Sequence, residues 1–511
     1  MRISLFFPVI GLIFVIGCRQ GGLPTANAKN QLPKRYLVVS LFDEGDPFDR
    51  ASETLVKRHQ ADHLHVAAEL LGLLDELRTR NPDYVAFVVK PDVLDINLAN
   101  RILKLSTEVD DDPFVDFAYG FITGRDADAA VKLVHAADAR RGLPSISQFG
   151  VGSDQSPASM QQKGALPLRG AIIPATFYTS HGDTDETRDE EFIKKSIPQL
   201  ARSPILLLAS HGYPDGLVGG PKAADIQGRD FHGSVALNIA CYTGVTKTWY
   251  EDDWATAKLR KREVSPETSF CLQMIDSGAA GYFAYLGPRP SGPTMIGDAT
   301  LIASSGETMG EHFRQHCNSV VLAHLMSGSD RVQFKEHVDG AKLDRNQTPR
   351  QIVMASSTGG VLIGDPAWQP FAELPDTNPT VTKVQREQGK LTAEVRIEVP
   401  TFHFYASEPL NYWNDRDSAF RLETIIEVDD QNMQQVRLTK NSLGDVPHSL
   451  VAAVEQHEGK RMLHMKAVFA HPGMEDLQRL MERGLAGTFV IETSPSTSEV
   501  QPQPLRTEVT E

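Results

Sequence analysis

The 511-residue sequence has few cysteines, a single long apolar run and more acidic than basic residues. Its four cysteines (Cys18, Cys241, Cys271 and Cys317) are too few for a disulfide scaffold. The formal net charge of −15 argues against nucleic acid or an anionic membrane surface as a main partner. After residue 16 no run is long and apolar enough to span a bilayer. In other respects the composition is that of an ordinary globular protein. The length of the chain predicts two or three domains.

The apolar run lies at the N-terminus and is typical of a targeting signal. Arg2 precedes the apolar stretch Ile3–Ile16, which is short for a spanning helix and fits a signal peptide. The sequence VIGC at 15–18 resembles the lipobox of bacterial lipoproteins. The resemblance implies removal of residues 1–17, lipidation of Cys18 and export to the cell envelope, where the lipid anchors the protein in the bilayer. We expect residues 18–34 to form a flexible tether.

From Tyr36 onward, extended and helical segments alternate. The expected strands cover 36–42, 84–90, 114–124, 205–210, 235–241 and 281–286, and the expected helices cover 51–79, 96–109 and 126–139. This alternation predicts an α/β domain over residues 35–375, with a mainly parallel sheet flanked by helices. Glycine, serine, proline and charged residues are mixed over 143–200. There we expect an insertion or an irregular connection.

A different pattern begins at DTNPT (376–380). In LTAEVRIEV (391–399) alternate residues are apolar, so that one face of a strand is apolar and the other largely polar. Similar segments cover 420–428, 461–469 and 487–493. The pattern predicts a small all-β sandwich over 376–494, with a short helix near 475–483. The polar, proline-rich residues 495–511 are expected to be disordered.

Two apolar strands each end in a residue that can carry chemistry. In SPILLLASHGYPDG (203–216) the run Ile205–Leu208 predicts a buried strand, and His211 and Gly212 follow it. In SVALNIACYTG (234–244) a second such strand ends at Cys241. Because chemistry in parallel sheets sits beyond the carboxyl ends of strands, we expect His211 and Cys241 to face each other.

This pair has the residue types of a nucleophilic dyad. The imidazole can take the thiol proton, and the thiolate can attack a carbonyl carbon. The backbone N–H groups of Gly212 and Cys241 could together bind the developing oxyanion. A strand-end cysteine by itself is more often a core residue, and two other His-Gly pairs begin at His181 and His232. Only His211 follows an uninterrupted aliphatic strand, with a second strand ending in Ala-Cys shortly after it.

The two strand ends resemble those of the caspase-like cysteine peptidases, and most closely the gingipain-type family. Further similar segments are FAYGFITGRDADAA (117–130), SFCLQMIDSGAAGYFAYLGP (269–288), GETMGEHFRQH (306–316) and VLIGDPAWQP (361–370). The resemblance implies a caspase-like fold, followed by an immunoglobulin-like domain in the place of the predicted sandwich. It also implies that the protein is a cysteine endopeptidase acting on polypeptides.

Carried over to this chain, the resemblance makes His211 the general base and acid and Cys241 the nucleophile, with Gly212 and Cys241 offering the oxyanion N–H groups. Some relatives orient the histidine with an upstream carboxylate, and Asp116, Asp183 and Asp185 are the candidates for it. The charged tract 243–263 after Cys241 could line a substrate site, with Trp249 and Trp254 as walls, or form a solvated loop. Cys271 and Cys317 are expected to fill the core.

Other interpretations stay open. The chain could keep a caspase-like fold without turnover and act in binding or assembly at the cell surface. A metal-dependent hydrolase is disfavoured, because no histidine or acidic cluster has the specific spacing of a motif such as HExxH. We therefore predict no metal ligand in the site and no cofactor. The acidic runs 110–112 and 251–253, together with the resemblance, suggest at most a structural calcium ion. The sequence does not indicate the oligomeric state.

Overall fold

In the computed structural model, the described residues from Arg35 onward belong to one compact unit. The residues that it describes are 34–139, 143–151, 158–167, 172–182, 184–253, 255–288, 299, 301–343, 359–374, 380–387, 390–397, 421–428, 432–444, 448–457, 459–469 and 484–494. Among these, no helix is both long and apolar enough to cross a membrane.

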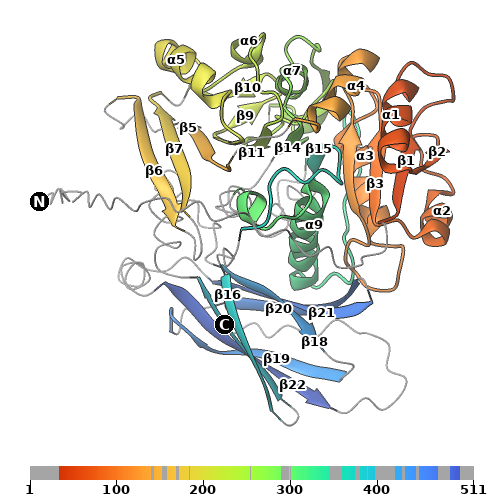
Figure 1. Ribbon diagram of the computed structural model, residues 1–511, viewed down its shortest axis with the longest axis vertical. Helices are drawn as coiled ribbons and strands as arrows, with labels where there is room; N and C mark the ends of the chain where they lie inside the picture. Colours follow the sequence, from red (N-terminus) through yellow and green to blue (C-terminus); the bar gives the residue numbers. More distant parts are fainter. Residues whose placement is uncertain are drawn as a thin grey trace, which may run out of the picture. The chain divides into compact units, whose positions relative to one another are not determined.

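The first part of the chain is built around an eleven-stranded sheet with helices packed on it (Figure 1). The strand order is β2-β1-β3-β4-β15-β14-β11-β8-β5-β7-β6. The strands are β1 (Tyr36–Ser40), β2 (Asp62–His65), β3 (Tyr84–Val88), β4 (Ala118–Ile122), β5 (Ile146–Val151), β6 (Met160–Pro167), β7 (Ile172–Ser180), β8 (Ile205–Ala209), β11 (Val235–Asn238), β14 (Gly281–Tyr285) and β15 (Gly360–Gly364). Most neighbours pair in parallel, while β6 is antiparallel to β7 and β15 to β14. The predicted α/β class is confirmed.

The helices pack in a row that follows the sheet. The contacts run from α1 to α4, α7, α6 and α5, while α9 packs against β4 and β15. Their bounds are α1 (Asp49–His59), α2 (Leu73–Arg80), α3 (Ile96–Ser106), α4 (Ala127–Ala136), α5 (Glu190–Leu200), α6 (Ala223–Ile226), α7 (Phe270–Asp276) and α9 (Met309–Met326). Two short hairpins lie outside the sheet, β9 (Gly212–Tyr213) with β10 (Gly216–Leu217) and β12 (Thr248–Asp253) with β13 (Lys258–Glu263). The apolar strands therefore lie in one covered core, as buried parallel sheets require.

Two sequence predictions were wrong in this part. Residues 143–200, expected to be irregular, contain β5, β7 and β6, which extend the sheet beyond β8, and α5. Here the mixed composition reflects a sheet edge, where β6 lies exposed beside β7. The expected single helix over 51–79 is instead α1, the edge strand β2 and α2. Asp62–His65 is only four residues long and polar, so the helical pattern on either side hid it.

The second part has seven antiparallel strands in two sheets, with orders β16-β17-β22-β19 and β18-β21-β20 (Figure 1, turquoise to blue). Their bounds are β16 (Thr380–Glu387), β17 (Lys390–Ile397), β18 (Arg421–Val428), β19 (Asn432–Asn441), β20 (His448–His457), β21 (Lys460–Phe469) and β22 (Leu485–Ser494). Apolar residues of both sheets share one core, among them Ala393, Leu422 and Phe489. The helix expected near 475–483 and the tail 495–511 lie outside the described residues. The immunoglobulin-like assignment and the boundary at 375/376 stay predictions.

Candidate functional site

The ends of β8 and β11 carry the two predicted site residues. These strands are parallel neighbours, and their register pairs Ile205 with Val235 and Leu208 with Asn238. His211 and Cys241 each follow the last of these pairs by three residues. The predicted adjacency of the two strands is confirmed, and it brings both residues to the same edge of the sheet, near its middle.

Beyond the last paired residues the two chains stay in close contact, and Gly212 is where they meet. A Cβ atom at Gly212 would lie 2.6 Å from the Ala240 Cβ atom and 2.7 Å from the carbonyl oxygen of Cys241. No side chain fits at that distance from a backbone oxygen. Glycine after His211 therefore allows the segment after β8 to lie directly against the Cys241 backbone.

The turn that carries Cys241 has an unusual backbone. Tyr242 has a φ of +59°, which costs a residue with a Cβ atom free energy that the surrounding structure must supply. The Tyr242 N–H donates to the carbonyl oxygen of Gly287, and the Gly244 N–H donates to that of Tyr285, so the segment after β14 anchors the turn on both sides of Thr243. Such strain next to a candidate nucleophile is the kind of feature that functional sites retain.

A buried hydrogen-bond chain fixes the same turn from inside. The Asn238 side chain accepts from the Ala240 N–H at 3.0 Å and donates to the Tyr282 hydroxyl at 3.0 Å. The Tyr282 hydroxyl donates to the Thr243 carbonyl oxygen at 2.9 Å, and the Thr243 hydroxyl donates to the Ala240 carbonyl oxygen at 2.9 Å. All four residues are fully buried. Asn238, Thr243 and Tyr282 were not among the predicted site residues; the asparagine within an apolar strand was the signal for them.

The loop after β8 is held as a tight hairpin. The Val218 N–H donates to the carbonyl oxygen of His211 at 2.9 Å, and the Ser210 hydroxyl donates to the carbonyl oxygen of Val218. Gly212 pairs with Leu217 between β9 and β10. In an antiparallel pair, hydrogen-bonded and non-hydrogen-bonded residue pairs alternate. Because Val218 bonds to His211, the next pair, Gly212 with Leu217, is non-hydrogen-bonded, and the Gly212 N–H points away from β10. The backbone thus keeps one N–H out of the hairpin ladder, as the oxyanion prediction requires.

The three described cysteines differ in exposure. Cys241 is partly exposed, whereas Cys271 on α7 and Cys317 on α9 are buried, which confirms the expectation that they fill the core. Burial raises the pKa of the Cys271 thiol well above its usual value and that of Cys317 to about 12. Of these three thiols, Cys241 is the one that a reagent in solution can reach. His211 is exposed as well.

The three candidates for a third catalytic residue fare differently. Asp116 precedes β4, which three strands separate from β8, roughly 19 Å at the usual strand spacing, so it is too far from His211. Asp183 lies outside the described residues. Asp185 reaches the loop after β8, where its carboxylate accepts from the Gly219 N–H at 3.1 Å and from Lys222 Nζ at 2.9 Å. Asp185 is therefore the candidate that the structure brings near the His211 loop, with Lys222 as its charge partner.

The charged tract after Cys241 forms the β12–β13 hairpin. Its carboxylates face arginines across the hairpin, Glu251 to Arg262 at 2.9 Å and Asp253 to Arg260 at 3.3 Å. Trp249 packs edge-on against Tyr242, with ring centroids 4.8 Å apart. The hairpin therefore lies beside the residue that follows Cys241, while Trp254 lies outside the described residues.

The first acidic run forms a cluster on the other side of the sheet's centre. Asp110 and Asp112 lie with Asp116, and their carboxylate oxygens are within 4.8 Å of one another. Burial, together with the charge of Asp110, raises the pKa of the Asp112 and Asp116 carboxyls, that of Asp112 to about 7. Like charges gathered at a buried position explain the direction. Structural calcium at this run stays an expectation.

The predicted signal peptide, the lipidation site at Cys18 and the predicted tether up to residue 33 lie outside the described residues. Neither a known family model nor any curated protein matches the sequence. One solved structure, named "Structure of Protease", resembles this chain with a TM-score of 0.40 and 8% identity, over 86% of this chain and 92% of the other. Likeness at that level assigns no family, and the gingipain-type resemblance stays a prediction. The chain is therefore an α/β protein whose mostly parallel sheet presents a histidine and an accessible cysteine after adjacent strand ends.

Proposed function

We propose that the chain is a cysteine endopeptidase of the gingipain type that hydrolyses polypeptides with His211 and Cys241. The observation that carries the proposal is the register of β8 and β11, which ends in this histidine and this cysteine at equal distance from the last paired residues. The close contact of Gly212 with the Cys241 carbonyl keeps the two ends together beyond the sheet. The partial exposure of Cys241 admits a substrate.

The proposed reaction is acyl transfer in two steps. His211 takes the thiol proton of Cys241, and the thiolate sulfur bonds to the carbonyl carbon of the scissile peptide. The C–N bond then breaks as the His211 imidazolium gives its proton to the leaving amine, and a thioester remains. Water attacks the thioester while His211 accepts its proton, and the carboxylic acid leaves with regeneration of the thiol.

In each step negative charge develops on the substrate carbonyl oxygen. The N–H groups of Gly212 and Cys241 are the proposed donors to it. The pairing of Gly212 with Leu217, which directs the Gly212 N–H out of the hairpin, supports the first donor. The buried hydrogen bonds around Ala240 and Thr243 support the second, because they restrain the backbone of the turn that carries Cys241.

The first test is alkylation of the folded mature protein with iodoacetamide at neutral pH, followed by peptide mapping. We expect rapid labelling of Cys241 that slows at least tenfold in His211→Ala, because the imidazole keeps the sulfur as thiolate. His232→Ala is the matched control, since His232 is also exposed and also precedes a glycine. A peptide-library digest with the wild type and Cys241→Ala tests turnover. Labelling that ignores His211, with no digestion, would favour the alternative of a silent caspase-like surface protein.

We further propose that the mature protein begins at Cys18 and is anchored to the bacterial envelope by a lipid on this residue. The lipobox-like VIGC sequence after a short apolar run supports the proposal. In cells that express the full chain, Cys18→Ser should move the protein from the membrane fraction to the soluble one. Equal membrane association of both versions would contradict lipidation at this position.

A further inference from the structure

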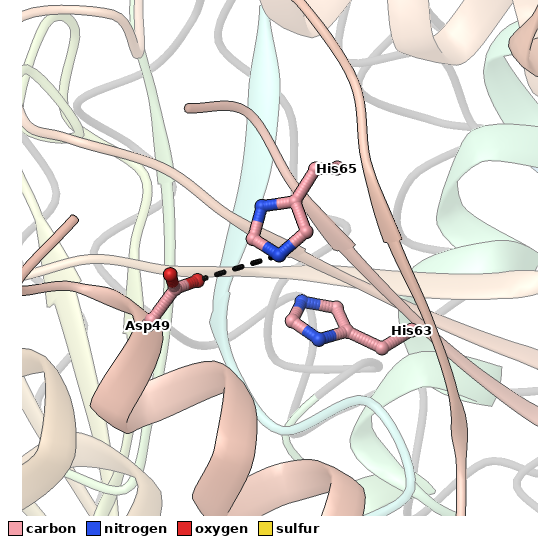
Figure 2. A group of neighbouring side chains, drawn as sticks. All are labelled: Asp49, His63 and His65. Atoms are coloured by element: carbon pink, nitrogen blue, oxygen red, sulfur yellow. Dashed lines mark ion pairs between the residues drawn. The ribbon is translucent and has the colours of Figure 1, made fainter. Parts of the chain in front are cut away.

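A cluster of side chains at the first strands of the sheet takes no part in the proposed reaction. Asp49 begins α1, and His63 and His65 alternate on the edge strand β2 (Figure 2). Because alternate residues of a strand point to the same face, both imidazoles emerge together. Figure 2 shows the Asp49 carboxylate facing the His65 ring, with the His63 ring beside it.

The distances within this cluster suit ligands of one ion better than hydrogen bonds. The candidate ligand atoms lie within 4.8 Å of one another. His65 Nε2 is 3.7 Å from Asp49 Oδ1, which is too long for a hydrogen bond. Two tetrahedral zinc ligands at bond lengths near 2.05 Å lie about 3.4 Å apart. A small contraction of the cluster would therefore bring these atoms to a shared metal ion.

A second, independent observation concerns Asp49 itself. Its side chain has one oxygen, Oδ2, that accepts from the Gly45 N–H, while the other, Oδ1, is buried and has no hydrogen-bond partner among the described residues. Asp49 as a whole is 9% exposed. A buried carboxylate oxygen without a donor is destabilising, and natural proteins rarely leave one so. A cation bound between Asp49 and the two histidines would satisfy it.

The outer contacts of the histidines match those of metal ligands. His65 Nδ1 lies 3.2 Å from the carbonyl oxygen of Phe42. Because a carbonyl can only accept, Nδ1 carries a proton, and in the neutral imidazole the nitrogen that can bind a metal ion is then Nε2, which lies toward Asp49. His63 Nε2 lies 2.9 Å from the Ser40 hydroxyl, which in turn lies 2.7 Å from that of Ser52. Outer partners of this kind orient metal-bound histidines in known sites.

We propose that Asp49, His63 and His65 bind a divalent transition-metal ion, with zinc as the best match. Two imidazole nitrogens and one carboxylate oxygen form a zinc donor set, whereas calcium and magnesium prefer oxygen ligands alone. The His65 side chain is 28% exposed, so water can reach the remaining coordination position. The site is separate from the proposed dyad, because β2 is the edge strand and six strands lie between it and β8.

The test measures zinc binding to the full-length mature chain after removal of metals by a chelator. It is done in a Cys241→Ala background, because a thiolate beside an imidazole would also bind zinc. Competition with a chromophoric chelator should show one zinc ion per chain, and zinc should raise the melting temperature. His65→Gln and Asp49→Asn should each weaken binding at least tenfold and abolish the rise.

His135→Gln is the matched control, since His135 is an exposed histidine with a carboxylate, that of Asp138, at 3.2 Å. It should bind zinc as the parent does. Calcium should not bind to Asp49, His63 and His65, so any change that it causes in the melting temperature should be the same in the parent and in His65→Gln. The proposal is overturned if the parent binds no zinc at one per chain, or if His65→Gln and Asp49→Asn bind it as tightly as His135→Gln. Melting temperatures of the metal-free variants show whether either has lost its fold, and His65→Gln, at a partly exposed position on the edge strand, keeps the test decisive.

Discussion

Gly212 shows how much one missing side chain can decide. Glycine after a candidate catalytic histidine was expected to leave an N–H open to the substrate. The structure adds that a Cβ atom here would strike the Cys241 carbonyl oxygen at 2.7 Å, a contact with backbone that no rotamer relieves. Gly150 on β5, which pairs with Ala209 of β8, differs, because among the described residues a Cβ atom there would come within 4 Å of the Ala209 oxygen alone, at 3.8 Å.

We therefore expect Gly212→Ala to push the Cys241 turn away and to slow alkylation of Cys241 at least tenfold. Gly150→Ala should leave the rate within about twofold of the wild type. Both rates are measured by mass spectrometry of the Cys241 peptide, with circular dichroism to confirm the fold. Equal alkylation rates for the two variants would show that the close approach of Gly212 to the Cys241 carbonyl oxygen does not affect the reactivity of Cys241.

A second residue-scale prediction concerns pH. Burial, and then the charges of Asp110 and Asp112, raise the pKa of Asp116 above its usual 3.8. As pH rises above 3.8 the unfolded chain loses this proton first, so the wild type loses stability until the folded carboxyl also ionises. Asn cannot ionise, and its side-chain oxygen can still accept from the Val109 N–H.

In the presence of a chelator, Asp116→Asn should therefore gain roughly 1–3 kcal/mol of unfolding free energy over the wild type between pH 4 and pH 8. Urea denaturation of both proteins at pH 4 and at pH 8 measures this difference in unfolding free energy. Asp111→Asn, an exposed carboxylate of the same loop, should gain nothing. A gain that is equal at both pH values would show that the titration of Asp116 is not its cause.

At the scale of elements, β11 and β14 act together through the buried chain that links Asn238, Tyr282 and Thr243. Tyr282 stands on β14, beside the strand that leads to Cys241. Its hydroxyl is the side-chain group of β14 that ties the turn to the sheet, beside the backbone bond from the Gly244 N–H to the Tyr285 carbonyl oxygen. Tyr282→Phe leaves the Asn238 amide and the Thr243 carbonyl without a partner, at an expected loss of about 1–3 kcal/mol.

We expect Tyr282→Phe to lower the unfolding free energy by that amount and also to slow Cys241 alkylation several-fold, because the turn loosens. Tyr119→Phe is the control, since in the described part of the chain the buried Tyr119 hydroxyl has the Cys317 sulfur, at 3.7 Å, as its one polar partner. Its effect should be small in both measurements. A loss of stability in Tyr282→Phe with no change in the alkylation rate would show that these buried hydrogen bonds stabilise the fold without affecting Cys241.

At the scale of the whole molecule, α9 joins the α/β part to the strand β20 through a buried ion pair. Arg314 Nη1 donates to Glu455 Oε1, and His464 Nε2 lies 2.6 Å from Glu455 Oε2. Burial alone would raise the pKa of Glu455, but the His464 hydrogen bond and the Arg314 charge outweigh it and lower the pKa to about 2. This contribution to stability is present above pH 4.5 and is lost as the pH falls toward 2.

Glu455→Gln should cost roughly 1.5–3 kcal/mol, because it removes one of the two carboxylates that pair with the buried Arg314, which keeps Glu311 at 2.9 Å from its Nε. The matched control is Glu427→Gln, whose partner Lys460 is exposed, and it should cost about 0–1 kcal/mol. Urea unfolding at pH 7 compares them, and the gap between them should narrow on acidification toward pH 2. Similar losses in both variants would mean that the α9–β20 contact does not couple the two parts.

The sequence by itself determined the local elements and their class. Apolar runs and alternation identify β8, β11, β14 and four strands of the second part, because burial on one or both faces leaves a direct pattern in the chain. The same patterns predict that the strands leading to His211 and Cys241 are neighbours, since short connections keep successive parallel strands together. Polar edge elements such as β2 and β6 leave no such pattern, and they were missed.

Only the tertiary structure decided which distant residues meet. The approach of Gly212 to the Cys241 carbonyl, the link from Asn238 through Tyr282 to Thr243, and the gathering of Asp49 with His63 and His65 all join separate segments. Their distances depend on register, on the crossing of strands and helices and on side-chain packing. None of these is encoded in the spacing of residues along the chain, because each arises from contacts that form only when the sheet is assembled.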